Sequence, residues 1–179
     1  KSYYTDHISP LMKSIFGFSF NSKFRSGGAH GVWGIQTSKK EVSTLFLSYG
    51  FTPGRKTHTV TIPSFIFESS LEVKRALVRG LFDTDGCIRF DRINKQALHT
   101  YPRIEYSSAS EALIDSLNKL LYELGFKSYS WKYGNYFALC ISGKLQLEKW
   151  IAEIKPGNPK HLKKYLFWRE KGFYAPSQN

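Results

Sequence analysis

Residues 77–86 read Leu-Val-Arg-Gly-Leu-Phe-Asp-Thr-Asp-Gly, and this stretch decides the fold. Its apolar positions predict a helix that carries Gly80 in its interior and ends in two acids, Asp83 and Asp85. A glycine inside a helix costs about 1 kcal/mol relative to alanine. Acids at a helix C-terminus face the negative end of the macrodipole. Two such costs in one short segment indicate a site where function overrides local stability.

The chemistry of the two acids suggests a divalent cation. Carboxylates held beside backbone carbonyls are good ligands for a hard ion such as Mg²⁺, with Mn²⁺ as a substitute. A structural alternative stays open at this point, because Asp-x-Asp-Gly is common in turns, where the acids bind backbone amides. These four residues alone do not decide between the two interpretations.

The sequence on either side of this helix predicts a regular order of elements. Apolar alternation and turn signals predict two hairpins, one of strands 87–92 and 101–106 and one of strands 126–131 and 136–141. Three further helices are predicted over 110–124, 144–154 and 159–171. Upstream, the pattern predicts a helix over 1–16, strands over 18–25 and 32–37, and a helix over 39–49. The chain is therefore expected to be an α+β protein.

The order of elements contains an internal repeat. At one constant offset, Ser38 matches Ser142, Lys40 matches Lys144, Phe46 matches Trp150 and Lys56 matches Lys160. We interpret residues 1–66 as a partial repeat that lacks a motif helix, and residues 67–179 as a complete repeat.

The charge of the chain indicates a polyanionic partner. Its 179 residues include 26 basic and 14 acidic side chains, for a net charge of +12. Nucleic acid is the most common partner of a folded domain this basic. No apolar run is long enough to cross a bilayer, and the N-terminus shows no secretory pattern. We therefore expect an intracellular protein, in the cytoplasm or an organelle, that does not bind a membrane.

The segment 78–86 resembles the LAGLIDADG motif of homing endonucleases. It keeps a glycine, a leucine, both acids and a final glycine of that motif, at Gly80, Leu81, Asp83, Asp85 and Gly86. Arg79 departs from the motif, where the family has a small residue. The order of elements and the tail 157–164 are similar to the family as well. The resemblance implies an αββαββα fold whose curved antiparallel sheet lies in the DNA major groove.

The resemblance also implies an activity and its residues. Members hydrolyse phosphodiester bonds in both strands of a specific DNA duplex with divalent metal, here expected to be Mg²⁺. By matching position, Asp85 is the catalytic acid and a metal ligand, and Thr84 adds a carbonyl ligand. Two motif helices pack side by side, here through Gly80 and Leu81, and Asp83 is mainly structural.

Two lysines are candidates for stabilising charge on the phosphate. Lys160 and its repeat partner Lys56 each follow a Gly/Pro loop after the same helix. The alternative is that they only contact DNA phosphates or solvent.

Strand alternation selects the side chains expected to contact base edges. Ile88, Phe90, Ile104 and Tyr106 are expected to face the core, so the residues between them face outward. The expected DNA-binding residues are Arg89, Asp91, Asn94, Lys95, Gln96, Arg103 and Glu105, with Asn21, Lys23 and Arg25 from the first copy and Lys127 and Lys132 from the second hairpin.

One motif supplies one catalytic acid, whereas a duplex has two strands. The motif helix is therefore expected to pair with a second copy in a homodimer, or with a motif segment missing from the N-terminus. Two other functions remain open on the same fold, an intron RNA maturase and a DNA-binding regulator that does not cut. Retention of both acids favours the nuclease, because unneutralised carboxylates repel phosphates. The gene is expected to belong to an intron or an intein.

Overall fold

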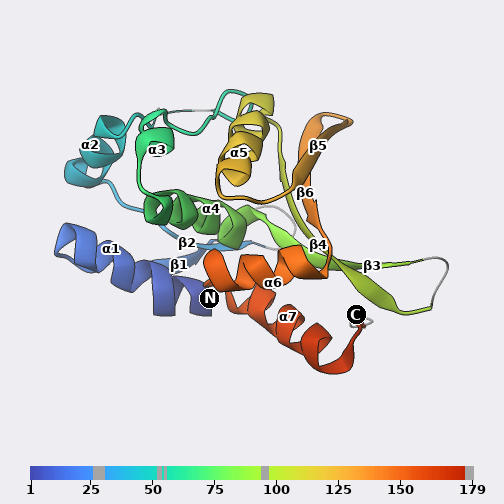
Figure 1. Ribbon diagram of the computed structural model, residues 1–179. Coiled ribbons are helices and arrows are strands. Elements are labelled where there is room, and N and C mark those ends of the chain that lie inside the picture. Colours follow the sequence, from blue (N-terminus) through green and yellow to red (C-terminus); the bar gives the residue numbers. More distant parts are fainter. Residues whose placement is uncertain (26–30, 52–53, 55, 94–96, 176–179) are drawn as a thin grey trace. The chain divides into compact units, whose positions relative to one another are not determined.

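The computed structural model consists of two units, Lys1–Pro53 and Gly54–Asn179, which are considered separately (Figure 1). It describes residues 1–25, 31–51, 54, 56–93 and 97–175. Residues 54–66, which we assigned to the partial repeat, lie in the second unit, and Ile62 and Ile66 belong to its core.

Unit 1 is smaller than the sequence pattern predicts. Its elements are a π-helical turn Tyr4–Ile8, α1 Ser9–Phe16, β1 Ser22–Arg25, β2 Val32–Ile35 and α2 Lys40–Ser48. The helix expected over 1–16 is present over residues 2–16, and its π-helical turn comes just before Pro10, which lies in the first turn of α1. β1 and β2 form an antiparallel pair, with Lys23 opposite Gly34.

Unit 2 has the expected αββαββα order. Its elements are α3 Phe65–Glu68, α4 Leu71–Asp85, β3 Cys87–Arg92, β4 His99–Ser108, α5 Glu111–Glu123, β5 Ser128–Tyr133, β6 Tyr136–Ser142, α6 Lys144–Glu153 and α7 Pro159–Lys171. Only the short helix α3 was not expected. The fold class predicted from the sequence is thereby confirmed.

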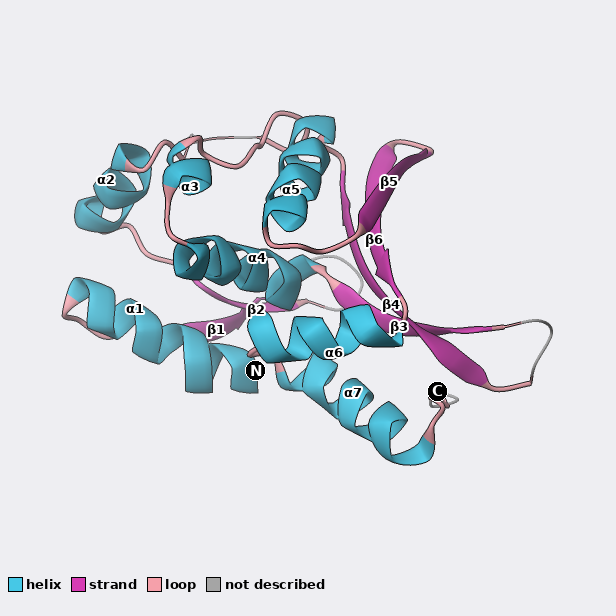
Figure 2. Cartoon of the chain, viewed as in Figure 1, coloured by secondary structure: helices cyan, strands magenta, loops and turns pink. Residues whose placement is uncertain are grey.

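The four strands of unit 2 form one antiparallel sheet in the order β3-β4-β6-β5. Helices α4 to α7 pack on one face of this sheet, as Figure 2 shows. That face carries Ile88, Ile104, Leu139 and Ile141, each at most 3% exposed. Phe90 and Tyr106 are buried as well, so the predicted inward positions are correct. The opposite face is left open for polar and aromatic side chains.

Candidate functional site

The end of α4 is fixed by its own sequence. Ser70 begins the helix by accepting a hydrogen bond from the Val73 N–H at 3.4 Å. The helix ends where the Gly86 N–H donates to the carbonyl oxygen of Phe82 at 2.9 Å. A Cβ on Gly86 would overlap the Phe82 ring and lie 2.8 Å from that carbonyl oxygen. Only glycine fits this turn into β3.

Asp83 has a structural position. Its side chain is buried at 1% exposure, and its carboxylate accepts a hydrogen bond from the Gly157 N–H at 2.8 Å. Its carbonyl oxygen accepts from Nδ2 of Asn158 at 2.7 Å. These partners immediately precede α7, so the carboxylate lies near the positive end of that helix. This placement offsets the unfavourable position of Asp83 at the end of α4.

Asp85 is arranged differently. It is exposed, and one carboxylate oxygen lies 3.2 Å from the hydroxyl of Thr84. That hydroxyl also lies 3.0 Å from the carbonyl of Leu81, so its single proton is shared between acceptors. Burial raises the pKa of Tyr106 to about 12, and the charge of Asp85 contributes to this rise. An exposed acid beside the start of β3 and the last residues of β4 is therefore available to an outside ligand.

The donor set at this end suits a magnesium-type ion. Mg²⁺ keeps several waters and takes one or two carboxylates together with phosphate oxygens from a substrate. Asp85 supplies one such carboxylate, and the backbone of Thr84 supplies a carbonyl nearby. Within the described residues, no three His, Cys, Asp or Glu side chains form a ready-made metal cluster.

The two candidate lysines have different surroundings. Lys160 is exposed at the start of α7. Burial raises the pKa of Cys87 and lowers that of His161, and the charge of Lys160 opposes the first shift and adds to the second. Lys160 therefore lies close to the end of α4. Lys56 opens a turn in which its carbonyl accepts from the Val60 N–H at 3.0 Å. The Val60 carbonyl accepts from the hydroxyl of Ser110, so this turn lies against the start of α5.

Four charged side chains on the open face of the sheet form an ion-pair network. It consists of Arg89, Asp91, Arg103 and Glu105, on adjacent strands β3 and β4. The Nε atom of Arg89 lies 3.1 Å from Glu105, and that of Arg103 lies 2.7 Å from Asp91. Burial raises the pKa of the Glu105 carboxyl, whereas Arg89 and Arg103 oppose this effect. The network is neutral overall and holds both guanidinium groups in place.

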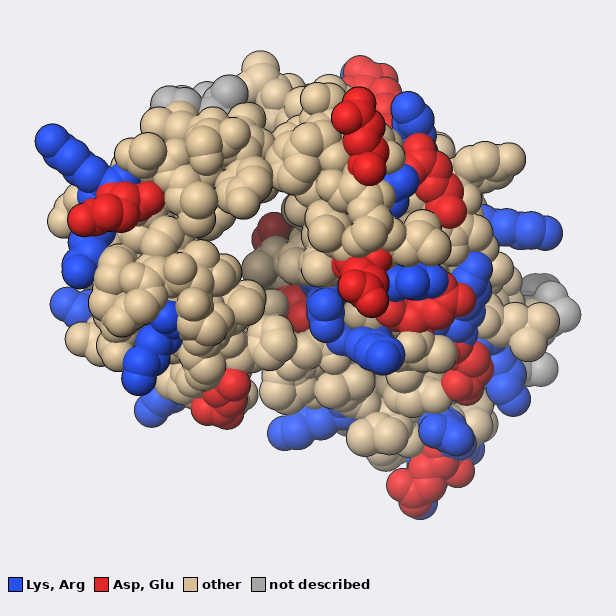
Figure 3. Space-filling view, turned by 60° about the vertical axis from the view of Figure 1, so that its left-hand side comes forward, with Lys and Arg blue, Asp and Glu red and all other residues tan. Residues whose placement is uncertain are grey.

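Opposite charges also meet on the helical side of unit 2. Lys74 pairs with Glu123 and Arg75 with Glu153, each at 2.8 Å. Figure 3 shows such mixing, with acidic and basic side chains next to one another on the right-hand part of the molecule. The visible surface there is not a continuous basic patch.

Aromatic side chains occupy the other half of the open sheet face. Tyr129 and Trp131 on β5 stack at 5.6 Å between ring centroids, and both are exposed. The Tyr129 hydroxyl accepts from Nη1 of Arg103 at 3.2 Å and so joins the two halves. Sequence reasoning missed this surface, because aromatic residues normally indicate burial. Strand register could have identified it.

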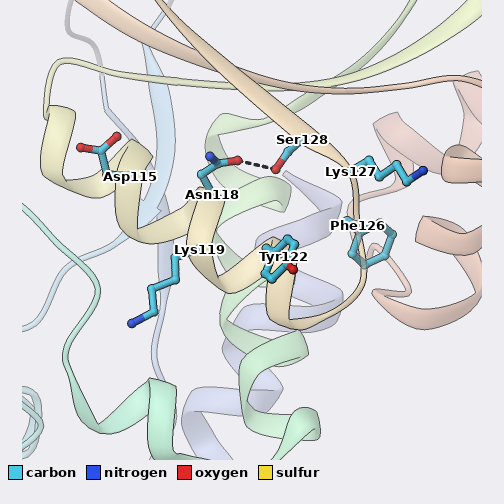
Figure 4. A pocket seen from close by; sticks show the side chains of 7 residues that line it. All are labelled: Asp115, Asn118, Lys119, Tyr122, Phe126, Lys127 and Ser128. Carbon is cyan, nitrogen blue, oxygen red and sulfur yellow. Dashed lines mark hydrogen bonds between the residues drawn. The ribbon is translucent and has the colours of Figure 1, made fainter.

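The expected face of Lys132 is wrong. It shares a face with Ser128, which donates to Asn118 of α5 at 2.5 Å, and its ammonium lies over Phe137. Lys132 therefore points to the helical side, because Tyr129 and Trp131 take the open side. Lys127 precedes β5 and borders a hollow beside α5 (Figure 4). The other residues that line this hollow are Asp115, Asn118, Lys119, Tyr122, Phe126 and Ser128.

Some expected DNA contacts cannot be placed. Asn94, Lys95 and Gln96 lie outside the described residues, as does the side chain of Arg25. In unit 1, Asn21 and Lys23 line one hollow together with Gln36, Thr37 and Ser38.

One side of α4 is open within unit 2. Gly80 is exposed, and a Cβ built on it would have no neighbour within 4 Å. Val73, two turns before Gly80 on the same side, is 41% exposed, while Leu81 packs only partly against the core. A second helix could approach the backbone closely at this point.

Among the described residues, no helix has both the length and the apolar character needed to cross a bilayer.

The central part of the chain matches a known protein family. Residues 72–155 match the family model of the LAGLIDADG-like domain. Three curated archaeal proteins also resemble the chain. A probable translation initiation factor IF-2 of Methanocaldococcus jannaschii is 29% identical over 60% of the chain and 9% of that protein. The DNA-directed RNA polymerase subunit Rpo1C of the same organism is 34% identical over 49% of the chain and 9% of that protein.

The third relative, elongation factor 2 of Methanopyrus kandleri, is 24% identical over 63% of the chain and 8% of that protein. The chain thus spans less than a tenth of each curated relative. Among solved structures, I-DmoI in complex with DNA and Mn has a TM-score of 0.56 at 16% identity, over 86% of this chain and 75% of that one. A structure of mesophilic variants of the homing endonuclease I-DmoI has a TM-score of 0.57 at 14% identity, over 87% of this chain and 75% of that one. The shared feature is the fold.

Proposed function

Because residues 72–155 match the family model of the LAGLIDADG-like domain, we propose that this protein is a homing endonuclease that cuts both strands of a specific DNA duplex. The observation that carries the proposal is the contrast between the two motif acids. Asp83 is buried and bonded to Gly157 and Asn158, whereas Asp85 is exposed at the end of the same helix. DNA complexes of the structural neighbours, solved with Mn or Mg, support the same activity.

Each residue at the end of α4 then has a role. Asp85 and the Thr84 carbonyl would hold a divalent cation, which neutralises phosphate charge and activates water for hydrolysis. Asp83 keeps the helix end in place. Lys160 places a positive charge beside this end, where it balances phosphate charge. Lys56 is proposed for the corresponding role, with a plain phosphate contact as the alternative.

The open sheet face is proposed to read base edges in the major groove. A guanidinium can bind guanine through two hydrogen bonds, and Arg89 and Arg103 are already oriented by their acids. Tyr129 and Trp131 offer apolar contact to thymine methyl groups. Because the ion-pair network is neutral, it adds little to sequence-independent attraction for phosphates. We therefore assign it to base recognition.

We propose that the open side of α4, at Gly80 and Leu81, packs against the same helix of a second copy. Pairing would bring a second Asp85 to the site and cover Val73. Sedimentation at micromolar concentration tests this. A dimer is expected, whereas a clean monomer of 20.6 kDa would assign the partner helix to a further segment of the same polypeptide.

An intein is the proposed origin of the gene. The three curated relatives have unrelated names, and the chain matches a small part of each. Such a pattern is expected of a mobile segment inserted into host proteins and translated with them. Expression of the whole surrounding reading frame tests this. We expect the segment to be excised, which leaves a shortened host polypeptide, and a host polypeptide that keeps the segment would contradict an intein.

The activity is tested by cleavage of a randomised duplex DNA library in Mg²⁺, with sequencing of the cut ends. The parent is expected to enrich one site, and Asp85→Asn is expected to abolish cutting but to keep binding. Asp115→Asn, an exposed acid on α5, is the matched control and should cut normally. Undiminished cutting by Asp85→Asn would refute its role, and no cutting by the parent would favour a binding protein or a maturase.

A further inference from the structure

Asn158 uses both ends of its amide to join two helices. Its Nδ2 donates to the carbonyl oxygen of Asp83 at 2.7 Å, and its Oδ1 accepts from the Lys160 N–H at 3.1 Å. The preceding Gly157 donates its N–H to the Asp83 carboxylate at 2.8 Å. One short loop thus holds the last turn of α4 and the first turn of α7.

Two further contacts from α7 lie on either side of Asp85 in the sequence. The ring of His161 packs on Phe82, with 4.5 Å between centroids. The ammonium of Lys164 donates to the carbonyl oxygen of Ile88 at 3.1 Å. Asp85 itself is exposed, so its position depends on these anchored neighbours.

Resting on the proposed function, we propose that Asn158 is a positioning residue for cleavage, which sets Asp85 and Lys160 relative to each other. The carbonyl groups in the last turn of a helix have no donors within that helix. Asn158 supplies a donor to one of them while its oxygen caps α7. A single amide therefore fixes the acid-bearing end of α4 and the backbone of Lys160 together. Small displacements of reacting groups slow catalysis steeply.

The substitution Asn158→Ser should remove the hydrogen bond to the Asp83 carbonyl while it keeps a cap for α7. Serine keeps an oxygen that can cap α7, but it is too short to reach the carbonyl of Asp83. In single-turnover reactions at saturating DNA and Mg²⁺, we expect cleavage to slow about 10- to 100-fold. Affinity for the same duplex without divalent metal should be unchanged, since the sheet is not altered. The apparent Mg²⁺ requirement should rise.

Asn118→Ser is the matched control. Asn118 also joins two elements, through its bond to Ser128 at 2.5 Å, but on the outer side of α5. Its variant should cleave at the parental rate even if its melting temperature falls. Equal slowing in both variants, or slowing matched by weaker DNA binding, would assign Asn158 a merely structural role and overturn the proposal.

Amide hydrogen exchange gives a readout that does not need cleavage. The Gly86 N–H bonds to the Phe82 carbonyl at 2.9 Å, directly after Asp85. In Asn158→Ser we expect exchange at Gly86 to quicken about tenfold, with the amides of α5 unchanged. Unchanged exchange at Gly86 would overturn the proposal. A parent that cuts no DNA would instead refute the proposed function, while the exchange result would still decide the role of Asn158 at this helix end.

Discussion

The two sides of α4 differ in what they contact within unit 2. On the buried side, Val78 and Phe82 lie in the core and Asp83 is bonded to the segment before α7. On the open side Gly80 is exposed, and Asp85 is exposed at the C-terminal end of the helix. The same helix thus carries stability on one side, the proposed pairing surface on the other and the proposed chemistry at its C-terminal end. Substitutions on the two sides should therefore change different measurements.

The largest expected effect is from Phe82→Ala. Phe82 is 2% exposed and packs on the rings of Trp150 and His161. Truncation should lower the free energy of unfolding by about 3–5 kcal/mol. Leu81→Ala, one residue away toward the open side, should cost less than half as much. Denaturant titration measures both, and equal losses would contradict the two-sided description.

Gly86→Ala should have the next largest effect. The added methyl would meet the Phe82 ring and a backbone carbonyl oxygen, neither of which can move freely. We expect a loss of about 2–3 kcal/mol in the free energy of unfolding. A loss below about 0.5 kcal/mol in the same titration would show that the turn is not tightly packed.

Acid should weaken the buried side through His161. Burial lowers the pKa of this side chain to about 4, and Lys160 and Lys164 add to the effect. The unfolded chain binds this proton more readily, so the contribution is complete above about pH 6.5 and is lost as the pH falls toward 4. Between pH 7.5 and 5 the loss should be about 2 kcal/mol. His161→Phe should lose that much less over this range, and identical pH profiles would contradict the assignment.

Gly80→Ala should have the smallest effect on stability and in the opposite direction. Its Cβ meets nothing within 4 Å, and alanine favours the helix by up to about 1 kcal/mol. If the open side pairs with another helix, however, the added methyl should weaken association. Calorimetry and sedimentation on the same sample would then change in opposite senses. A variant that is more stable and equally dimeric would move the pairing surface elsewhere.

The elements of unit 2 were predictable because its periodicity is simple. Ile88 and Ile104 alternate with charged residues, and Ser110 marks the start of α5. Lys132 was misplaced because Tyr129 and Trp131 make the inward face of this hairpin ambiguous in the sequence, and the structure leaves both aromatic side chains exposed. The contact of Asp83 with Gly157 joins residues 74 apart in the chain, and no local pattern contains such a pair. The family resemblance therefore predicted a structural role for Asp83, whereas the physical reason for that role is visible only in the folded chain, where the segment before α7 bonds to its carboxylate.

The ion-pair network on the sheet has a consequence for changing the target. Each of its arginines is oriented by an acid on its own or the adjacent strand. Under the proposed function, replacing Arg103 alone would remove the nearer cation of Asp91, at 2.7 Å, and leave only Arg89 at 3.3 Å to balance its charge against the DNA. That cost is unrelated to the new base pair. If the sheet reads bases as proposed, a change of target should therefore proceed by exchanging arginine and acid together.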